Sequence, residues 1–181
     1  MLEVLCKSQI VNLTFGYTPG FILQARLLGR ITMRAVITTV LDTSAGKAWE
    51  NVQLRKTMLY ICEGLLSFKT HNLPERFVIG SEAQCKIWFF NILPGWEHNW
   101  RISNIDQNRM IIDSEEHGGL VKRWHHLIKI ETLDNEQCTY IDDIDIEAGL
   151  ATPLVWLWAN VFYRYRHWRW KKLIKLEFSI D

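Results

Sequence analysis

The chain has 181 residues, 48% of them hydrophobic, and its 21 lysines and arginines nearly balance its 20 aspartates and glutamates. This length suits one domain that buries a core of its own, and the balanced charge argues against nucleic acid as a partner. The four cysteines, Cys6, Cys62, Cys85 and Cys138, are spaced too widely for a metal site, so we expect free thiols in a reducing cytoplasm and no bound metal.

The first predicted elements are a strand and two short helices. Residues 1–30 follow neither the helical nor the strand period and are predicted to form an arm that precedes a domain spanning 31–181. Residues 31–41 are rich in β-branched side chains, which predicts a strand. Helices are expected at 45–52 and at about 56–68, where apolar residues recur at helical spacing.

After Asn72 the hydrophobic period changes from helical to alternating, which is typical of strands. Short loops rich in glycine, proline, asparagine and aspartate separate the alternating stretches, so neighbouring strands are expected to run antiparallel. The predicted strands lie near 76–80, 84–92, 98–105, 109–115, 120–132 and 137–147. Together with the first strand they predict an antiparallel sheet of about seven strands.

A single long helix is predicted from Thr152 to Leu176. Thr152 is suited to cap its start and Pro153 to occupy its first turn. Apolar residues cover most of its circumference, including a series at helical spacing: Leu154, Leu157, Val161, Tyr165 and Trp168. Such a helix must be covered, and the sheet is the only predicted partner long enough to cover it. The expected architecture is α+β, with a curved sheet wrapped on the helix and a cavity between them.

Three sequence features carry a family resemblance: Trp124-His125-His126 in a strand, the turn Asp134-Asn135-Glu136, and Phe162-Tyr163-Arg164-Tyr165-Arg166-His167 in the long helix. With the order of elements over about 31–176, the sequence resembles the START-like, helix-grip domains of the SRPBCC superfamily, which include polyketide cyclase/dehydrase-like proteins and coenzyme Q-binding carriers. This resemblance implies a pocket for a small hydrophobic molecule such as a lipid, quinone, isoprenoid or polyketide-like compound. It implies no cofactor, because the cysteine and histidine pairs of a Rieske centre are absent.

Strand parity singles out a histidine and an aspartate. His126 shares one strand face with Trp124 and Ile128, and we expect this face to turn toward the helix. Asp142 is expected close to His126 if its own strand turns Tyr140 inward. Together, His126, Asp142 and Tyr140 could transfer protons in a cyclase, aromatase or dehydratase reaction. A purely structural pair is the alternative.

Aromatic residues at matching strand parity, with others on the helix, predict a wall suited to a flat apolar ligand, and plain core packing is the alternative. The predicted ligand-binding residues are Trp88, Phe90, Trp100, Ile112, Trp124, His126, Ile128, Tyr140, Trp158 and Phe162. Two functions stay open. One is a non-catalytic carrier or sensor of a small hydrophobic molecule, and the other is a cyclase-type enzyme that uses the same cavity.

The end of the long helix is basic, with tryptophans between the cations. Such a run is usually a solvated helix face, and contact with an anionic membrane surface is the alternative. That contact would use Arg164, Arg166, Arg169, Lys171 and Lys172. No stretch has the pattern of a secretory signal or the roughly 20 apolar residues of a membrane span. We therefore expect a cytoplasmic protein, either free or at the membrane periphery.

Overall fold

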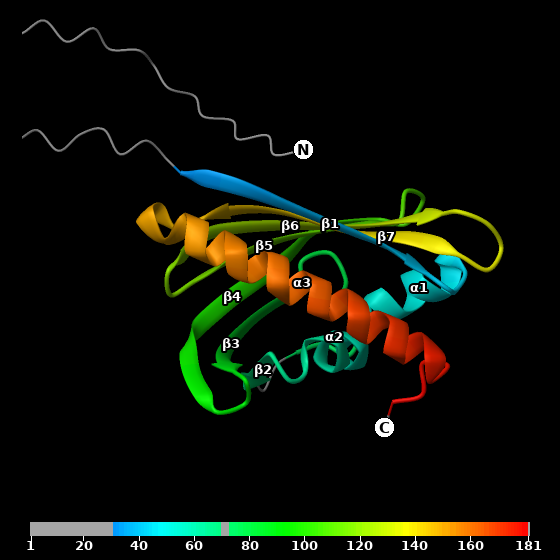
Figure 1. Ribbon diagram of the computed structural model, residues 1–181, viewed down its shortest axis with the longest axis horizontal. Helices are drawn as coiled ribbons and strands as arrows, with labels where there is room; N and C mark the ends of the chain where they lie inside the picture. The colour runs from blue at the N-terminus through cyan, green and yellow to red at the C-terminus, as the bar shows by residue number, and fades with distance from the viewer. Residues whose placement is uncertain (1–30, 70–72, 181) are drawn as a thin grey trace, which may run out of the picture.

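The computed structural model describes residues 31–69 and 73–180, so the predicted arm at 1–30 lies outside the described part of the chain (Figure 1). The strands are β1 (Thr32–Leu41), β2 (Leu66–Lys69), β3 (Glu82–Phe89), β4 (Leu93–Asp106), β5 (Ile111–Gly118), β6 (Val121–Thr132) and β7 (Cys138–Glu147). The helices are α1 (Ala45–Val52), α2 (Arg55–Cys62) and α3 (Thr152–Lys175), and a 3₁₀ turn, η1 (Gly149–Ala151), precedes α3.

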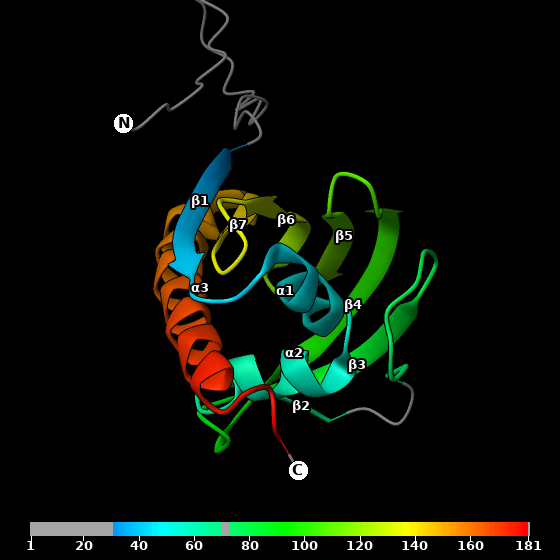
Figure 2. The same ribbon diagram turned by 90° about the vertical axis from the view of Figure 1, so that its right-hand side faces the viewer.

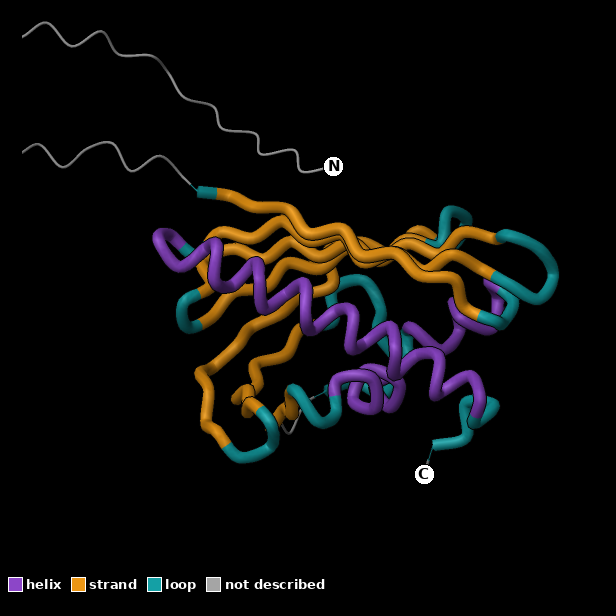
Figure 3. The backbone as a smooth tube through the Cα atoms, viewed as in Figure 1, coloured by secondary structure: helices purple, strands orange, loops and turns teal. Residues whose placement is uncertain are grey.

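One antiparallel sheet curls around α3. Its strands follow the order β1-β7-β6-β5-β4-β3-β2. Figure 2 shows the strands curving from β1 to β2, with α3 along the open side and α1 and α2 at one end of the curve. The tube in Figure 3 separates the strand layer from the helices that lie on its concave side. Because a long twisted sheet curls, one helix can fill its trough only in part. The predicted α+β architecture, with about seven strands, is confirmed.

The segment after α2 differs from the prediction. The predicted helix at 56–68 ends at Cys62, because Gly64 adopts a φ of +96° that helices do not tolerate, and Leu66–Lys69 then pairs with β3 as the edge strand β2. The predicted strand at 76–80 is wrong: Arg76 makes one isolated bridge with Leu54. The sheet therefore has seven strands because β2 takes the place of the strand predicted at 76–80.

The reversal between β3 and β4 also differs from the prediction. Residues 93–95, which fall between the strands predicted at 84–92 and 98–105, belong to β4, and the chain instead reverses at Phe90 and Asn91, whose φ angles are 53° and 61°. A register shift between Lys86 and Trp88 accompanies this turn. The extra residue of this irregularity lies in β4, between Pro94 and Glu97, so the alternation of side chains along β3 is unbroken.

The apolar series predicted for α3 is not its buried face. Leu154 is 68% exposed, and Leu157, Val161 and Trp168 are each about half exposed. The buried face instead comprises Val155, Ala159, Phe162, Tyr163, Arg166, His167, Trp170 and Leu173. Ala159 is fully buried, since its small side chain lets the helix backbone approach the sheet closely. The helix thus presents two apolar stripes, and only the one that includes the small residue packs inward.

The start of α3 is also corrected. Ala151 occupies the cap position, and Thr152 lies inside the helix, where its hydroxyl accepts from the Ala148 N–H at 2.9 Å and donates to the Gly149 carbonyl at 2.7 Å. Thr152 therefore fixes the turn that leads into the helix. Within the described residues, no helix has the length and apolar character needed to cross a membrane.

Candidate functional site

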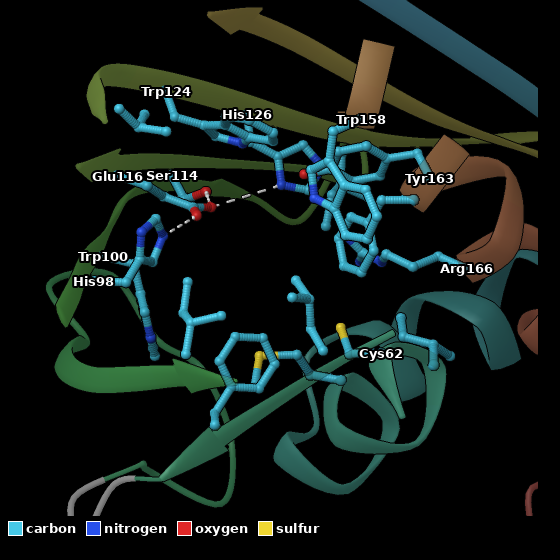
Figure 4. Close-up of a pocket in the computed structure, with 18 of the residues that line it drawn as sticks. Cys62, His98, Trp100, Ser114, Glu116, Trp124, His126, Trp158, Tyr163 and Arg166 are labelled. Carbon is cyan, nitrogen blue, oxygen red and sulfur yellow. Dashed lines mark hydrogen bonds and ion pairs between the residues drawn. The ribbon is translucent and has the colours of Figure 1, made fainter. Parts of the chain in front are cut away.

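A cavity of about 290 Å³ lies between α3 and the concave face of the sheet (Figure 4). Side chains from α2, from strands β2 to β6 and from α3 form its wall. Most of them are apolar or aromatic, among them Phe77, Phe89, Trp96, Trp100, Ile112, Trp124, Ile128, Trp158 and Phe162. The polar members of the wall include His98, Ser114, Glu116, His126 and Arg166. The cavity is therefore a hydrophobic space with a few polar groups at defined places.

A chain of buried acidic and basic side chains runs from the cavity into the protein interior. The Glu116 carboxylate accepts from His98 Nε2 at 2.8 Å and from the Ser114 hydroxyl at 3.0 Å, and it lies 3.9 Å from His126 Nδ1. The other nitrogen of His126, Nε2, lies 2.7 Å from Asp142 Oδ1. β5, β6 and β7 are adjacent strands, and their matching register brings these residues side by side.

Asp142 joins the sheet to α3. Its second oxygen, Oδ2, accepts from His167 Nε2 at 2.9 Å, and its side chain has no exposed surface. The two histidines therefore donate to both oxygens of one carboxylate. Since the Nε2 atom of His126 must carry a hydrogen to donate to Asp142, its Nδ1 atom is the one that faces Glu116.

The two carboxylates favour the charged form of His126. Burial alone would lower the pKa of His126, but the hydrogen bond to Asp142 and the proximity of Glu116 raise it above its ordinary value of 6.5. Burial alone would raise the pKa of each carboxyl. The Arg166 charge and the two histidines outweigh burial at Asp142, and the histidines do so at Glu116, so both pKa values lie well below their ordinary range.

Arg166 brings a second positive charge to the cavity. The residue is 6% exposed and projects from α3, with its guanidinium carbon 4.8 Å from the Tyr163 ring centre and 5.8 Å from that of Phe162. Its Nε is buried and has no hydrogen-bond partner among the described residues. Asp142 interacts with this guanidinium through its charge and raises the pKa of Arg166.

Two further ionisable groups in the wall, Cys62 and Tyr163, keep their protons. Burial raises the pKa of the Cys62 thiol to about 11 and that of the Tyr163 hydroxyl well above 10. Neither group is therefore a nucleophile or a base at neutral pH.

Seven of the predicted ligand-binding residues line the cavity: Trp100, Ile112, Trp124, His126, Ile128, Trp158 and Phe162. The other three do not. Trp88 lies on the convex face of β3, where Lys69 covers its ring at 4.1 Å, because Ile87 and Phe89 face inward instead. Phe90 lies in the turn after β3, is 47% exposed and contacts Trp158 from outside the wall.

The three predicted catalytic residues also differ in whether they border the cavity. Tyr140 is fully buried against the rings of His167 and Trp170 and does not border the cavity. Asp142 lies next to His126 as expected but has no surface on the cavity. Of the three, only His126 borders it, so Asp142 can act on a bound molecule only through that histidine.

Sequence reasoning missed several polar residues of this site. Glu116 lies just past the predicted end of its strand, although it shares the parity of Ile112 and Ser114, which could have revealed it. Arg166 and His167 were expected in a solvated basic run. Their spacing of four from Phe162 and Tyr163 is the signal that could have placed them on the buried face.

The basic run at the end of α3 is therefore smaller than predicted. Arg166 is buried, and Arg169 is held by the Glu63 carboxylate at 2.7 Å and the Tyr60 carbonyl at 3.0 Å. The exposed members are Arg164, Lys171 and Lys172. Contact of these three with a membrane stays a prediction.

Comparison with known proteins identifies the fold. No family model matches the sequence, and no curated protein matches it. A solved structure of norcoclaurine synthase from Thalictrum flavum, in complex with dopamine and hydroxybenzaldehyde, matches at 15% identity and a TM-score of 0.64, over 96% of this chain and 100% of that one. A START superfamily protein from Mycobacterium smegmatis matches at 11% identity and a TM-score of 0.58, over 79% of this chain and 97% of that one. The chain shares the helix-grip fold of these two structures, as its sequence predicted.

Proposed function

We propose that this protein binds one small, ring-bearing hydrophobic molecule in the cavity and acts as its carrier or sensor. The observation that supports this most strongly is the cavity of about 290 Å³, whose wall is mainly aromatic and aliphatic with a few convergent polar groups. Pockets of this composition are the usual sites of small ligands. The aromatic residues of the wall offer ring faces and edges on which a flat molecule can pack.

The size of the cavity narrows the class of ligand. Its volume lies at the lower end of the roughly 300–1,000 Å³ typical of ligand pockets, which favours a compound of one or two rings over a lipid with long chains. The norcoclaurine synthase structure holds dopamine and hydroxybenzaldehyde, which are one-ring aromatic compounds. Among the ligands implied by the sequence, a quinone head group or a small polyketide-like ring therefore fits best.

A cyclase or dehydratase activity is the second candidate, and His126 is the observation that favours it. This histidine borders the cavity and its raised pKa makes it a proton donor. A matching base is harder to find. Glu116 also borders the cavity, but its lowered pKa makes it a weak base, and the pKa values of Cys62 and Tyr163 keep both protonated. These protonation states favour binding over catalysis.

Native mass spectrometry of the full chain, isolated without dialysis from cells that naturally produce it, tests the proposal. We expect the intact ion to carry one small molecule per chain, which denaturation releases for identification. The proposal fails if the protein is empty and also retains no naphthalene when this compact apolar probe is added. Turnover of an identified molecule that is lost in His126→Gln would instead support the enzymatic candidate.

A further inference from the structure

Arg166 differs from the neighbouring arginines of α3 in the hydrogen bonds of its guanidinium group. Arg169 is bonded to Glu63 and Tyr60, and Arg164 donates to the Asn160 carbonyl at 2.8 Å. The Nε atom of Arg166 is buried without such a partner among the described residues, while its charge lies against aromatic rings in the cavity wall. Burying a charged donor without an acceptor is costly, so an acceptor in the cavity would stabilise this arrangement.

The nearby carboxylate does not supply that acceptor. Asp142 balances the charge of Arg166, but its two oxygens already accept from His126 at 2.7 Å and from His167 at 2.9 Å. Figure 4 shows the Arg166 side chain reaching from α3 toward the cavity. The group best placed to receive its hydrogens is therefore one on a bound molecule.

Glu116 provides the complementary group on the opposite wall. Its carboxylate can only accept, and it offers more lone pairs than the contacts from His98 and Ser114 use. Its side chain keeps 20% of its surface exposed, whereas that of Asp142 keeps none. Figure 4 shows the Glu116 oxygens and the Arg166 guanidinium on opposite sides of the cavity. A bound molecule can therefore meet an acceptor at one end and a donor at the other.

We propose that the cavity selects a compact ring compound with two polar ends, in which a carboxylate or carbonyl oxygen accepts from Arg166 and a hydroxyl group donates to Glu116. A hydroxyl fits the Glu116 end because that carboxylate already has a positively charged neighbour in His126. The apolar wall, including Trp100, Trp124 and Phe162, holds the ring between the two ends. This inference rests on the proposed function and specifies the chemical class of its ligand.

Four naphthalene probes with matched rings test this inference: naphthalene, naphthol, naphthoate, and a hydroxynaphthoate with its two substituents on different rings. Titration of the full-length wild-type protein by tryptophan fluorescence or calorimetry gives the four affinities. We expect hydroxynaphthoate to bind tightest and naphthalene weakest. Each polar group should strengthen binding by about tenfold, as hydrogen bonds to charged groups do.

Two variants test which residue is responsible for each gain in affinity. Arg166→Met should remove the advantage of naphthoate over naphthalene, and Glu116→Gln should reduce the advantage of naphthol. Each advantage is the ratio of two affinities measured in the same variant, so a change in naphthalene binding itself does not affect it. Retained naphthalene binding also shows that each variant is folded. If a variant fails to fold, the order of the four probes on wild-type protein still decides the matter.

Equal binding of all four probes to wild type would overturn this inference and leave the proposed function intact. So would gains that persist unchanged in both variants. If none of the four binds, naphthalene included, the proposed function itself fails.

Discussion

The imidazole of His126 lies between two carboxylates, one facing the cavity and one hidden behind it. The Glu116 side chain is partly exposed in the cavity, whereas Asp142 is fully enclosed and both of its carboxylate oxygens accept hydrogen bonds from histidines. The enclosed carboxylate therefore serves stability and orientation, and the open one is free to meet a ligand. Because a buried charge is stabilised by its partners, removing one member of this network should leave the remaining charges unpaired and destabilise the folded protein.

Asp142→Asn tests the structural part of this network. The amide keeps the shape of the carboxylate, but its NH₂ group would face a histidine N–H. Arg166 would lose its counter-charge, and His126 would keep only that of Glu116. We expect the free energy of unfolding to fall by about 3–5 kcal/mol, the usual cost of breaking a buried ion pair, measured by chemical denaturation.

Asp143→Asn is the matched control, because the adjacent Asp143 lies on the other face of β7 and binds Arg34 Nε at 2.7 Å near the surface. The free energy of unfolding of Asp143→Asn should fall by no more than about 1 kcal/mol. Equal losses in the two variants would contradict the structural role given to Asp142.

The same network predicts how stability depends on pH. The folded pKa of His126 is raised, so its stabilising contribution is complete below pH 6.5 and is lost as the pH rises through the folded value. The lowered pKa values of Asp142 and Glu116 act in the opposite sense, because their contributions are complete above 3.8 and 4.5 and are lost as the pH falls through the folded values. Stability should therefore be greatest in the mildly acidic range.

Denaturation of wild type and His126→Gln over a pH series checks the alkaline side. The wild type should be the more stable protein in mild acid, and the difference should shrink as the pH rises. Parallel stability curves for the two proteins would show that His126 does not hold an extra proton in the folded state.

At the scale of elements, α3 is fixed by hydrogen bonds to three other parts of the chain. Trp156 Nε1 donates to the Arg34 carbonyl in β1 at 2.8 Å, and His167 binds Asp142 in β7. Tyr165 donates its hydroxyl hydrogen to the Glu63 carbonyl, just past the end of α2, at 2.5 Å. The turn after α2 therefore lies directly beneath the helix that closes the cavity.

Gly64→Ala tests this turn. Gly64 has a φ of +96°, and a Cβ there would lie 2.6 Å from the Tyr165 hydroxyl oxygen, so the methyl group adds both backbone strain and a clash. We expect a loss of more than about 1 kcal/mol in the free energy of unfolding. Gly46→Ala in α1 is the control, because a Cβ at that position meets no atom within 4 Å.

The control should leave the protein unchanged or stabilise it by up to about 1 kcal/mol, since alanine favours the helix more than glycine does. Comparable losses in both variants would mean that the turn after α2 carries no particular constraint.

Periodicity predicted most of the elements but did not always predict their faces. The alternation in β6 and β7 placed His126 and Asp142 together correctly, because regular strands preserve parity over their length. Trp88 was assigned to the wrong face: it shares the parity of Gln84 and Lys86, whereas Ala83, Cys85 and Ile87 form the buried face. On α3 two apolar stripes competed, and the spacing of four from Phe162 assigns Arg166 to one of them without showing that this stripe is the inner one. Its buried charge is balanced by that of Asp142, a residue far away in the sequence.

At the scale of the whole molecule, the curl of the sheet and the single helix leave a space that neither fills. Residues from α2 and from most of the strands contribute to its wall, so the site depends on the complete fold rather than on one motif. The end of β3 adds a side to it, because Phe89 borders the cavity and packs edge-on against Trp158 of α3, which Phe90 covers from outside. A molecule bound there would contact the sheet and the helix together and should stabilise the closed arrangement.

The most direct test of the binding cavity is a titration of naphthalene into wild type, Cys62→Phe and Cys62→Ala, followed by tryptophan fluorescence. Trp96, Trp100, Trp124 and Trp158 border the cavity and should report its occupation. Figure 4 shows the Cys62 sulfur pointing into this space, so a phenylalanine there would fill it. We predict that wild type and Cys62→Ala bind one naphthalene per chain and that a folded Cys62→Phe binds it at least about tenfold more weakly, through overlap with the added ring. Unchanged binding in Cys62→Phe would contradict the account, because the ligand would then lie somewhere other than between α3 and the sheet.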